Sequence, residues 1–143
     1  MKTTLAAIAV LLLNLSAAGA DPEPFLKSAP MPFYPPLCRQ ARIQGQVILH
    51  FIIDEKGDPS DVEAVTGPAM LQRAAIKEVQ TWKFSWDHPC ACQVKREVVF
   101  VYTLGDWIDE EGPSSVVKWF GRGPVDRVEI QAGLISVQTS TSK

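Results

Sequence analysis

The chain has 143 residues, of which 46% are hydrophobic and 21% are charged, and its formal net charge is −2. This length is enough for one domain with its own core and short for two. The sequence contains neither a polybasic patch nor a long acidic run. The composition therefore argues against nucleic acids and anionic membrane surfaces as partners.

Residues 1–20 have the features of a secretory signal peptide. A positive start at Lys2 is followed by a short apolar core over 5–13 and by the small residues Ala18, Gly19 and Ala20. A membrane-spanning helix needs about 20 apolar residues, which this core does not reach. We therefore expect cleavage before Asp21 and export; retention of 1–20 would instead anchor the chain in the inner membrane. A proline-rich lead follows over 21–33.

The segment 34–66 predicts a short helix and a β-hairpin. Tyr34-Pro35-Pro36 favours extended backbone before each proline and a helix start, so 37–41 can form a first helix. Residues 47–53 alternate as a strand, with one apolar side formed by Val47, Leu49, Phe51 and Ile53. Gly57 suits a hairpin turn, and 60–65 can return as a second strand.

The segment 67–104 predicts a second helix and a third strand. Gly67-Pro68 predicts the start of a helix. The spacing of the apolar residues that follow places them on one face of that helix: Leu71, Ala75, Val79 and Trp82. Residues 98–104 alternate again as a strand. The order helix, strand, strand, helix, strand predicts an α+β domain: a small antiparallel three-stranded sheet with two helices on one face.

The order of these signals resembles the C-terminal domain of the TonB energy-transducer family over 34–104. The shared pattern is a Tyr-Pro start, a Gly-x-Val before the first strand, an Ile-Asp-x-x-Gly hairpin and a Trp-basic-Phe sequence at the end of the second helix. In this chain the pattern is carried by Tyr34, Pro35, Gly45, Asp54, Gly57, Trp82 and Phe84.

The resemblance implies an exported, non-enzymatic, periplasmic protein-binding module without a cofactor, associated with TonB-dependent transport across the outer membrane. In the family, an extended segment of an outer-membrane transporter adds as a further strand to the edge of the third strand. Main-chain hydrogen bonds then supply the affinity. The matching edge in this chain comprises Glu97, Val98, Val99, Phe100, Val101, Tyr102 and Thr103. The same edge could also join two copies of the chain as a homodimer.

A complete energy transducer of this family has an uncleaved membrane helix and a long proline-rich spacer, whereas the lead over 21–33 is short. The alternative function is therefore a self-associating or tail-capped periplasmic interaction domain without energy transduction.

Three cysteines suggest a disulfide, because an exported protein meets an oxidising compartment. We expect Cys38 to pair with Cys90 or Cys92, which would stabilise the fold by about 2–4 kcal/mol. A bridge between Cys90 and Cys92 would close a very small ring and is the less favoured pairing.

A thiol- or metal-binding protein is the second alternative. His88, Cys90 and Cys92 lie close together in the sequence, but structural zinc sites need four ligands in paired spacings, so no metal site is predicted. Cys90-Ala91-Cys92 also lacks the Cys-x-x-Cys spacing of thiol oxidoreductases. The serines lack a Gly-x-Ser-x-Gly context and no phosphate loop is visible, so no catalytic residue is predicted.

The C-terminal extension over 105–143 is rich in β-forming residues. We expect one strand over 115–120 and two more, over 128–130 and 135–139, around a turn at Ala132-Gly133. A sheet with one solvated face should alternate cleanly, yet the second face would carry Ile48, Ile52, Val99 and Val101. We therefore expect the extension to cover that face and to leave the edge at 97–103 free.

Overall fold

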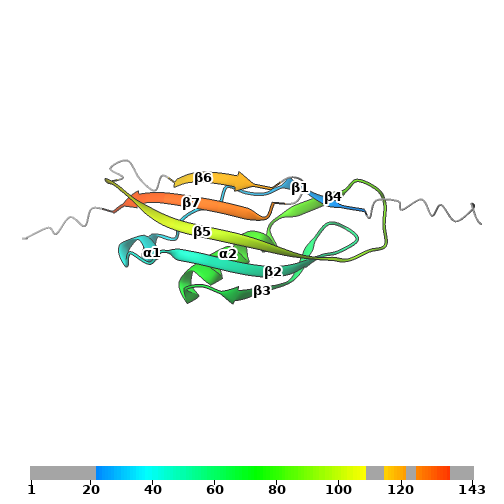
Figure 1. The fold of residues 1–143 in the computed structure, drawn as a ribbon, viewed down its shortest axis with the longest axis horizontal. Coiled ribbons are helices and arrows are strands. Elements are labelled where there is room, and N and C mark those ends of the chain that lie inside the picture. The colour runs from blue at the N-terminus through cyan, green and yellow to red at the C-terminus, as the bar shows by residue number, and fades with distance from the viewer. Residues whose placement is uncertain (1–21, 109–114, 122–124, 136–143) are drawn as a thin grey trace, which may run out of the picture.

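A computed structural model describes residues 22–108, 115–121 and 125–135. Residues 1–20, the predicted signal peptide, lie outside the described residues. In the part of the chain that is described, no helix is long and apolar enough to cross a membrane. The elements, shown in Figure 1, are β1 (Pro24–Ser28), α1 (Pro36–Gln40), β2 (Gly45–Ile53), β3 (Pro59–Thr66), α2 (Ala69–Gln80), β4 (Lys83–Trp86), β5 (Val94–Ile108), β6 (Ser115–Phe120) and β7 (Arg127–Leu134).

The main sheet has five strands in the order β3-β2-β5-β7-β6. Strands β5 and β7 are parallel, and the other neighbours are antiparallel. Strands β1 and β4 form a separate two-stranded antiparallel sheet. The α+β class with two helices is confirmed, but the predicted three-stranded antiparallel sheet is wrong, because the C-terminal extension adds β7 and β6 to it.

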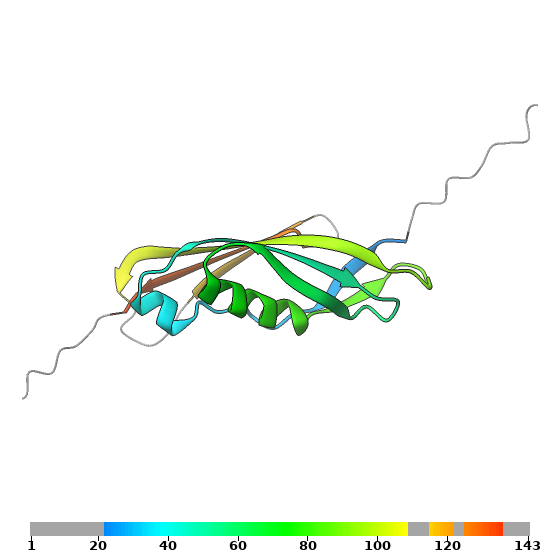
Figure 2. The same ribbon diagram turned by 90° about the horizontal axis from the view of Figure 1, so that it is seen from below.

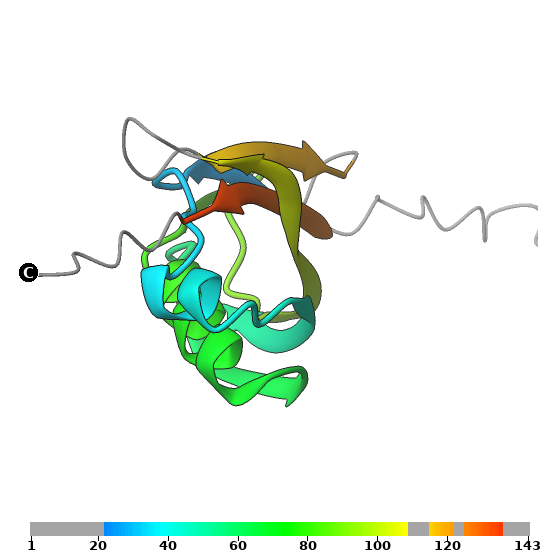
Figure 3. The same ribbon diagram turned by 90° about the vertical axis from the view of Figure 1, so that its left-hand side faces the viewer.

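Both helices lie on the same side of the main sheet (Figure 2), and the sheet curls around them when seen end on (Figure 3). The alternation predicted for β2 is confirmed, because its inward residues are buried while its other side chains are partly or fully exposed. Helix α2 packs on β2 and β3, and α1 contacts β7. The strand residues that the helices help to cover include Val47, Leu49, Phe51, Ile53, Val98, Phe100 and Tyr102.

Helix α2 follows the predicted stripe. Pro68 occupies its N-cap position, and Leu71, Ala75 and Val79 are its buried residues. Trp82 lies two residues beyond the end of the helix and is also fully buried. The helical stripe therefore continues into the turn that leads to β4.

Gly57 in the β2–β3 hairpin packs closely against β4 and forms a hydrogen bond with it. This residue has φ 84°, in the left-handed region, and a Cβ there would collide with the carbonyl of Phe84. The amide of Phe84 donates a hydrogen bond of 2.9 Å to the Gly57 carbonyl. The contact explains why the hairpin needs glycine at this position.

The C-terminal extension completes the core. Strand β6 is found where it was predicted, and β7 buries Val128, Ile130 and Ala132 completely. The predicted turn at Ala132-Gly133 is wrong, because β7 continues through both residues. Residues 136–139 of the last predicted strand lie outside the described residues.

The predicted covering of the second sheet face is also wrong. The extension joins the sheet edge to edge, so the apolar residues of that face stay partly exposed. They are Ile48, Ile52, Val99 and Val101.

Candidate strand-addition site

Strand β5 is paired along both of its sides. On one side lies β2, and on the other lies β7 in parallel register, from Val99 opposite Arg127 to Leu104 opposite Ala132. Glu97 and Val98 precede the stretch paired with β7. The predicted free edge over 97–103 is therefore wrong for Val99, Phe100, Val101, Tyr102 and Thr103. The chain satisfies these main-chain groups with its own strand, which is one way that proteins protect an edge.

Side-chain packing holds β7 in this position. Its three inward residues are fully buried, and burying a valine or isoleucine side chain contributes about 1.5–3 kcal/mol each. From α1, Arg39 donates hydrogen bonds to the Gly133 carbonyl, from Nε at 3.0 Å and from Nη2 at 2.7 Å. Trp119 of β6 contacts the core ring of Trp82 at a centroid distance of 5.7 Å. A partner strand would have to replace all of these contacts to take the place of β7.

Strand β3 ends the sheet on one side and is irregular. Its register with β2 shifts between Ile48 and Leu49 and again between His50 and Ile52. Asp61 in β3 has φ 48°, and two acidic residues of this strand, Asp61 and Glu63, are exposed. Bulges and charges are the usual features that discourage pairing at an edge.

Strand β6 ends the sheet on the other side and is regular. It pairs with β7 without a register shift, from Ser115 opposite Ala132 to Phe120 opposite Arg127. Lys118 is its only charged residue, and Val116 and Phe120 are 51% and 43% exposed. Within the described part of the chain, no strand pairs with the outer side of β6. A regular, largely apolar edge of this kind is a template for another strand.

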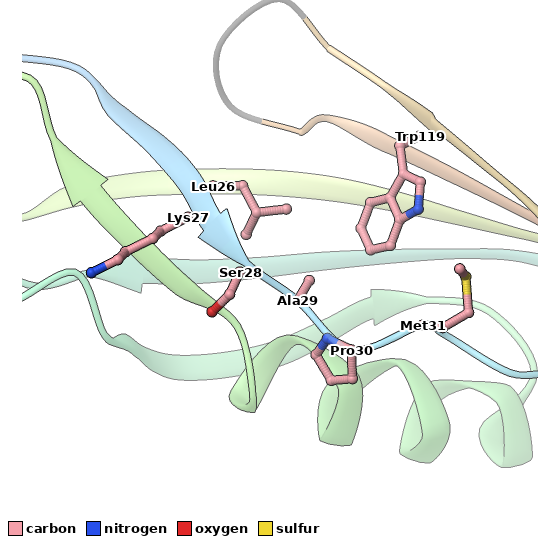
Figure 4. Close-up of a pocket in the computed structure, with 7 residues that line it drawn as sticks. All are labelled: Leu26, Lys27, Ser28, Ala29, Pro30, Met31 and Trp119. Carbon is pink, nitrogen blue, oxygen red and sulfur yellow. The ribbon is translucent and has the colours of Figure 1, made fainter.

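A hollow of about 330 Å³ lies beside β6. Figure 4 shows the Trp119 ring extending from β6 toward the segment that follows β1, with the side chains of Leu26 and Met31 near it. Met31 is 72% exposed, so this side of the hollow is open to solvent. The full lining consists of Leu26, Lys27, Ser28, Ala29, Pro30, Met31 and Trp119.

The family-motif residues serve the fold. The Asp54 carboxylate accepts hydrogen bonds from the amides of Lys56 at 2.9 Å and Asp58 at 2.8 Å, which fixes the hairpin turn. Gly45 has φ 146° and lies against Pro68. Pro35 occupies the N-cap position of α1. Trp82 and Phe84 are core residues.

Two tyrosines are buried near α1, and the carboxyl group of Glu78 in α2 is partly buried. The Tyr34 hydroxyl donates a hydrogen bond of 2.6 Å to the Ile43 carbonyl, and burial raises the pKa of Tyr34 to about 12. Burial also raises the pKa of Tyr102, whose ring meets Tyr34 edge to face at 5.4 Å. The pKa of Glu78 is raised because burial disfavours its charged form. Among the described residues, no group of His, Cys, Asp and Glu could hold a metal ion.

The cysteines pair differently from the prediction. Cys90 and Cys92 form a disulfide with a Cα–Cα distance of 5.2 Å, and Cys38 is a free, fully buried thiol. The predicted bridge to Cys38 is wrong because α1 and the β4–β5 loop lie at opposite ends of the sheet (Figure 1). Cys38 acts as a small core residue, and burial raises its pKa.

Sequence reasoning missed Arg39 and β1. Arg39 is only 3% exposed, and a charged residue in a short helix gives no sign of a distant carbonyl partner. Strand β1 lies in the proline-rich lead, where alternation is masked by proline. Its first residue, Pro24, is compatible with a strand because, among the described residues, β1 pairs on one side only, with β4.

The family of the Gram-negative bacterial TonB protein C-terminal domain matches residues 30–104, just over half of the chain. No curated protein matches. The solution NMR structure of the Pseudomonas aeruginosa TonB CTD is similar to this chain at 23% sequence identity and a TM-score of 0.42, covering 59% of this chain and 88% of that one. On the family match, which includes every motif residue named above, this chain belongs to the TonB C-terminal domain family.

Proposed function

We propose that this chain is a non-enzymatic, periplasmic protein-binding module that takes an extended segment of an outer-membrane TonB-dependent transporter as an added strand at β6. Family membership supports the class of partner and the mode of binding. The observation that supports β6 as the binding strand is the parallel pairing of β7 with β5. Among the described strands, this pairing places β6, and not β5, at the edge of the sheet.

The surroundings of β6 favour a segment with alternating side chains. Main-chain hydrogen bonds to the edge supply affinity, and every second side chain of the added strand points to one face. On the inner face, an apolar side chain would enter the hollow beside Trp119. On the outer face, the segment would meet Val116 and Phe120, with an acidic residue favoured near Lys118.

Proline substitutions in β6 test this position. Consecutive residues of a strand direct their N–H groups to opposite sides, so only one of Val117→Pro and Lys118→Pro removes a group that faces away from β7. We expect that variant to unfold at nearly the wild-type denaturant midpoint but to lose binding of transporter-derived peptides, measured by calorimetry. Glu63→Pro, on the β3 edge, is the matched control and should keep binding. Unchanged binding in both β6 variants would exclude this edge.

A second copy of the chain is the competing occupant of the edge. Two β6 strands paired antiparallel about Val117 would place Val116 opposite Lys118 of the other copy and so avoid two lysines facing each other. Sedimentation equilibrium of the peptide-free protein distinguishes binding of a transporter segment from self-association. A monomer that binds peptide supports the transporter segment, whereas a dimer abolished by the same proline variant supports self-association.

A further inference from the structure

The Cys90–Cys92 disulfide joins two residues of one loop. The cysteines are separated by 2 positions, in the connection between β4 and β5. A disulfide stabilises a fold mainly by closing a long loop in the unfolded chain, and this bridge closes a very short one. It also links no two helices or strands. A structural role therefore explains little of its presence.

The bridge is open to other molecules. Cys90 and Cys92 are both partly exposed, and Ala91 between them is exposed. Cys92 lines a hollow of about 430 Å³ together with Pro22, Glu23, Val94 and Arg96. Cys92 is therefore partly exposed and borders a hollow that is open to solvent. Cys38 offers no such access, because it is fully buried.

Arg96 and Glu23 form an ion pair in the lining of the same hollow. One of the terminal nitrogens of Arg96, Nη2, lies 3.2 Å from Glu23 Oε1. The Nε of Arg96 is buried and has no hydrogen-bond partner among the described residues. A neighbouring arginine favours the thiolate over the thiol, and the thiolate is the species that attacks a disulfide. The hollow thus combines a partly exposed disulfide with the guanidinium of Arg96, whose charge is shared with the Glu23 carboxylate.

We propose that Cys90–Cys92 is a thiol–disulfide exchange site that oxidises a pair of cysteine thiols in another polypeptide. A substrate thiolate in the hollow attacks Cys92 Sγ, the Cys90–Cys92 bond breaks, and Cys90 leaves as a thiolate that takes a proton from water. The second substrate thiolate attacks the substrate sulfur of this mixed disulfide and releases Cys92. The substrate gains a disulfide, and the pair Cys90 and Cys92 is reduced by the same two electrons.

The test uses the oxidised full chain and a reduced synthetic peptide with two cysteines. Acid-quenched samples are alkylated and followed by mass spectrometry. We expect one peptide disulfide per chain, formed about tenfold or more faster than by oxidised glutathione at equal concentration. Arg96→Gln should slow the reaction several-fold. Lys95→Gln, which removes a neighbouring exposed charge outside the hollow, should leave the rate unchanged.

The Cys90→Ala/Cys92→Ala variant distinguishes this chemistry from side reactions. Because the bridge links no two elements, we expect this variant to remain folded in a thermal melt and to oxidise no peptide. A wild-type rate no faster than that of oxidised glutathione would overturn the proposal. So would peptide oxidation by the double variant, or two free thiols at these positions in protein isolated from an oxidising compartment. None of these measurements depends on transporter binding.

Discussion

The buried guanidinium of Arg39 donates two hydrogen bonds to the carbonyl oxygen of Gly133, a residue 94 positions away. The contact joins α1, at the start of the segment that matches the family, to β7 in the C-terminal extension. It also satisfies a strand carbonyl with a charged donor, which makes the hydrogen bonds stronger than neutral ones. The extension is thereby fixed to the family domain as well as paired with it.

Arg39→Met should weaken the fold. The substitution keeps much of the aliphatic volume but leaves the Gly133 carbonyl, which is buried, without these donors, at a cost of about 1–3 kcal/mol. Urea unfolding of the full chain measures the loss. Arg73→Met, at an exposed position of α2, is the control and should change stability by less than about 0.5 kcal/mol. Equal midpoints for the two variants would show that the Arg39 contact contributes nothing.

A chain that ends after Gly105 should fail to fold stably. Truncation removes the buried side chains of β7 and uncovers the β5 edge that they protect. Loss of Val128 and Ile130 alone forfeits about 3–6 kcal/mol of apolar burial, comparable to the whole stability of many small domains. We expect weak near-ultraviolet circular dichroism and binding of a hydrophobic dye. A truncated chain with a wild-type melting transition would contradict this and would revive 34–104 as an independent unit.

The local elements of the family domain could be predicted because their signals lie within a few residues. The Leu71, Ala75 and Val79 stripe specifies the buried face of α2, and alternation in 47–53 specifies the buried face of β2. The turn at Gly57 follows from its need for positive φ. In α2 and β2 the spacing of apolar residues indicates the buried face, and at Gly57 the residue type indicates a positive φ.

The place of the extension could not be predicted in this way. Alternation in β7 tells which of its residues face inward, but the same pattern fits a strand beside β5 and a layer over the second sheet face. The choice depends on contacts between distant segments, such as those of Arg39 with Gly133 and Trp119 with Trp82. The candidate edge was therefore predicted at β5, whereas the sheet ends at β6.

Trp82→Ala should be strongly destabilising. The Trp82 ring is fully buried and meets the rings of Phe51, Phe84, Phe100 and Trp119 at centroid distances between 5.7 and 6.4 Å. Removing a core tryptophan costs about 3–5 kcal/mol through lost burial and the cavity left behind. Guanidinium unfolding measures the loss, and Phe33→Ala, an aromatic residue that is 60% exposed, serves as the control. A loss below about 1 kcal/mol for Trp82→Ala would be inconsistent with the packing at the junction of α2, β5 and β6.

The carboxyl group of Glu78 should make stability depend on pH. Burial raises its pKa above the ordinary value of 4.5, and the interaction with the Trp82 side chain offsets only part of this effect. The folded state therefore binds the proton more tightly than the unfolded state. The stability from this group is fully present below pH 4.5 and is lost as the pH rises through the folded pKa.

Glu78→Gln keeps the neutral shape at every pH, so it should be more stable than the wild type at pH 7, with the difference shrinking as the pH falls toward 4.5. Urea midpoints of both proteins across this range measure the effect, and Glu55→Gln, on the exposed hairpin turn, is the control. A constant difference at all pH values would mean that the carboxylate of Glu78 finds compensating partners in the folded protein.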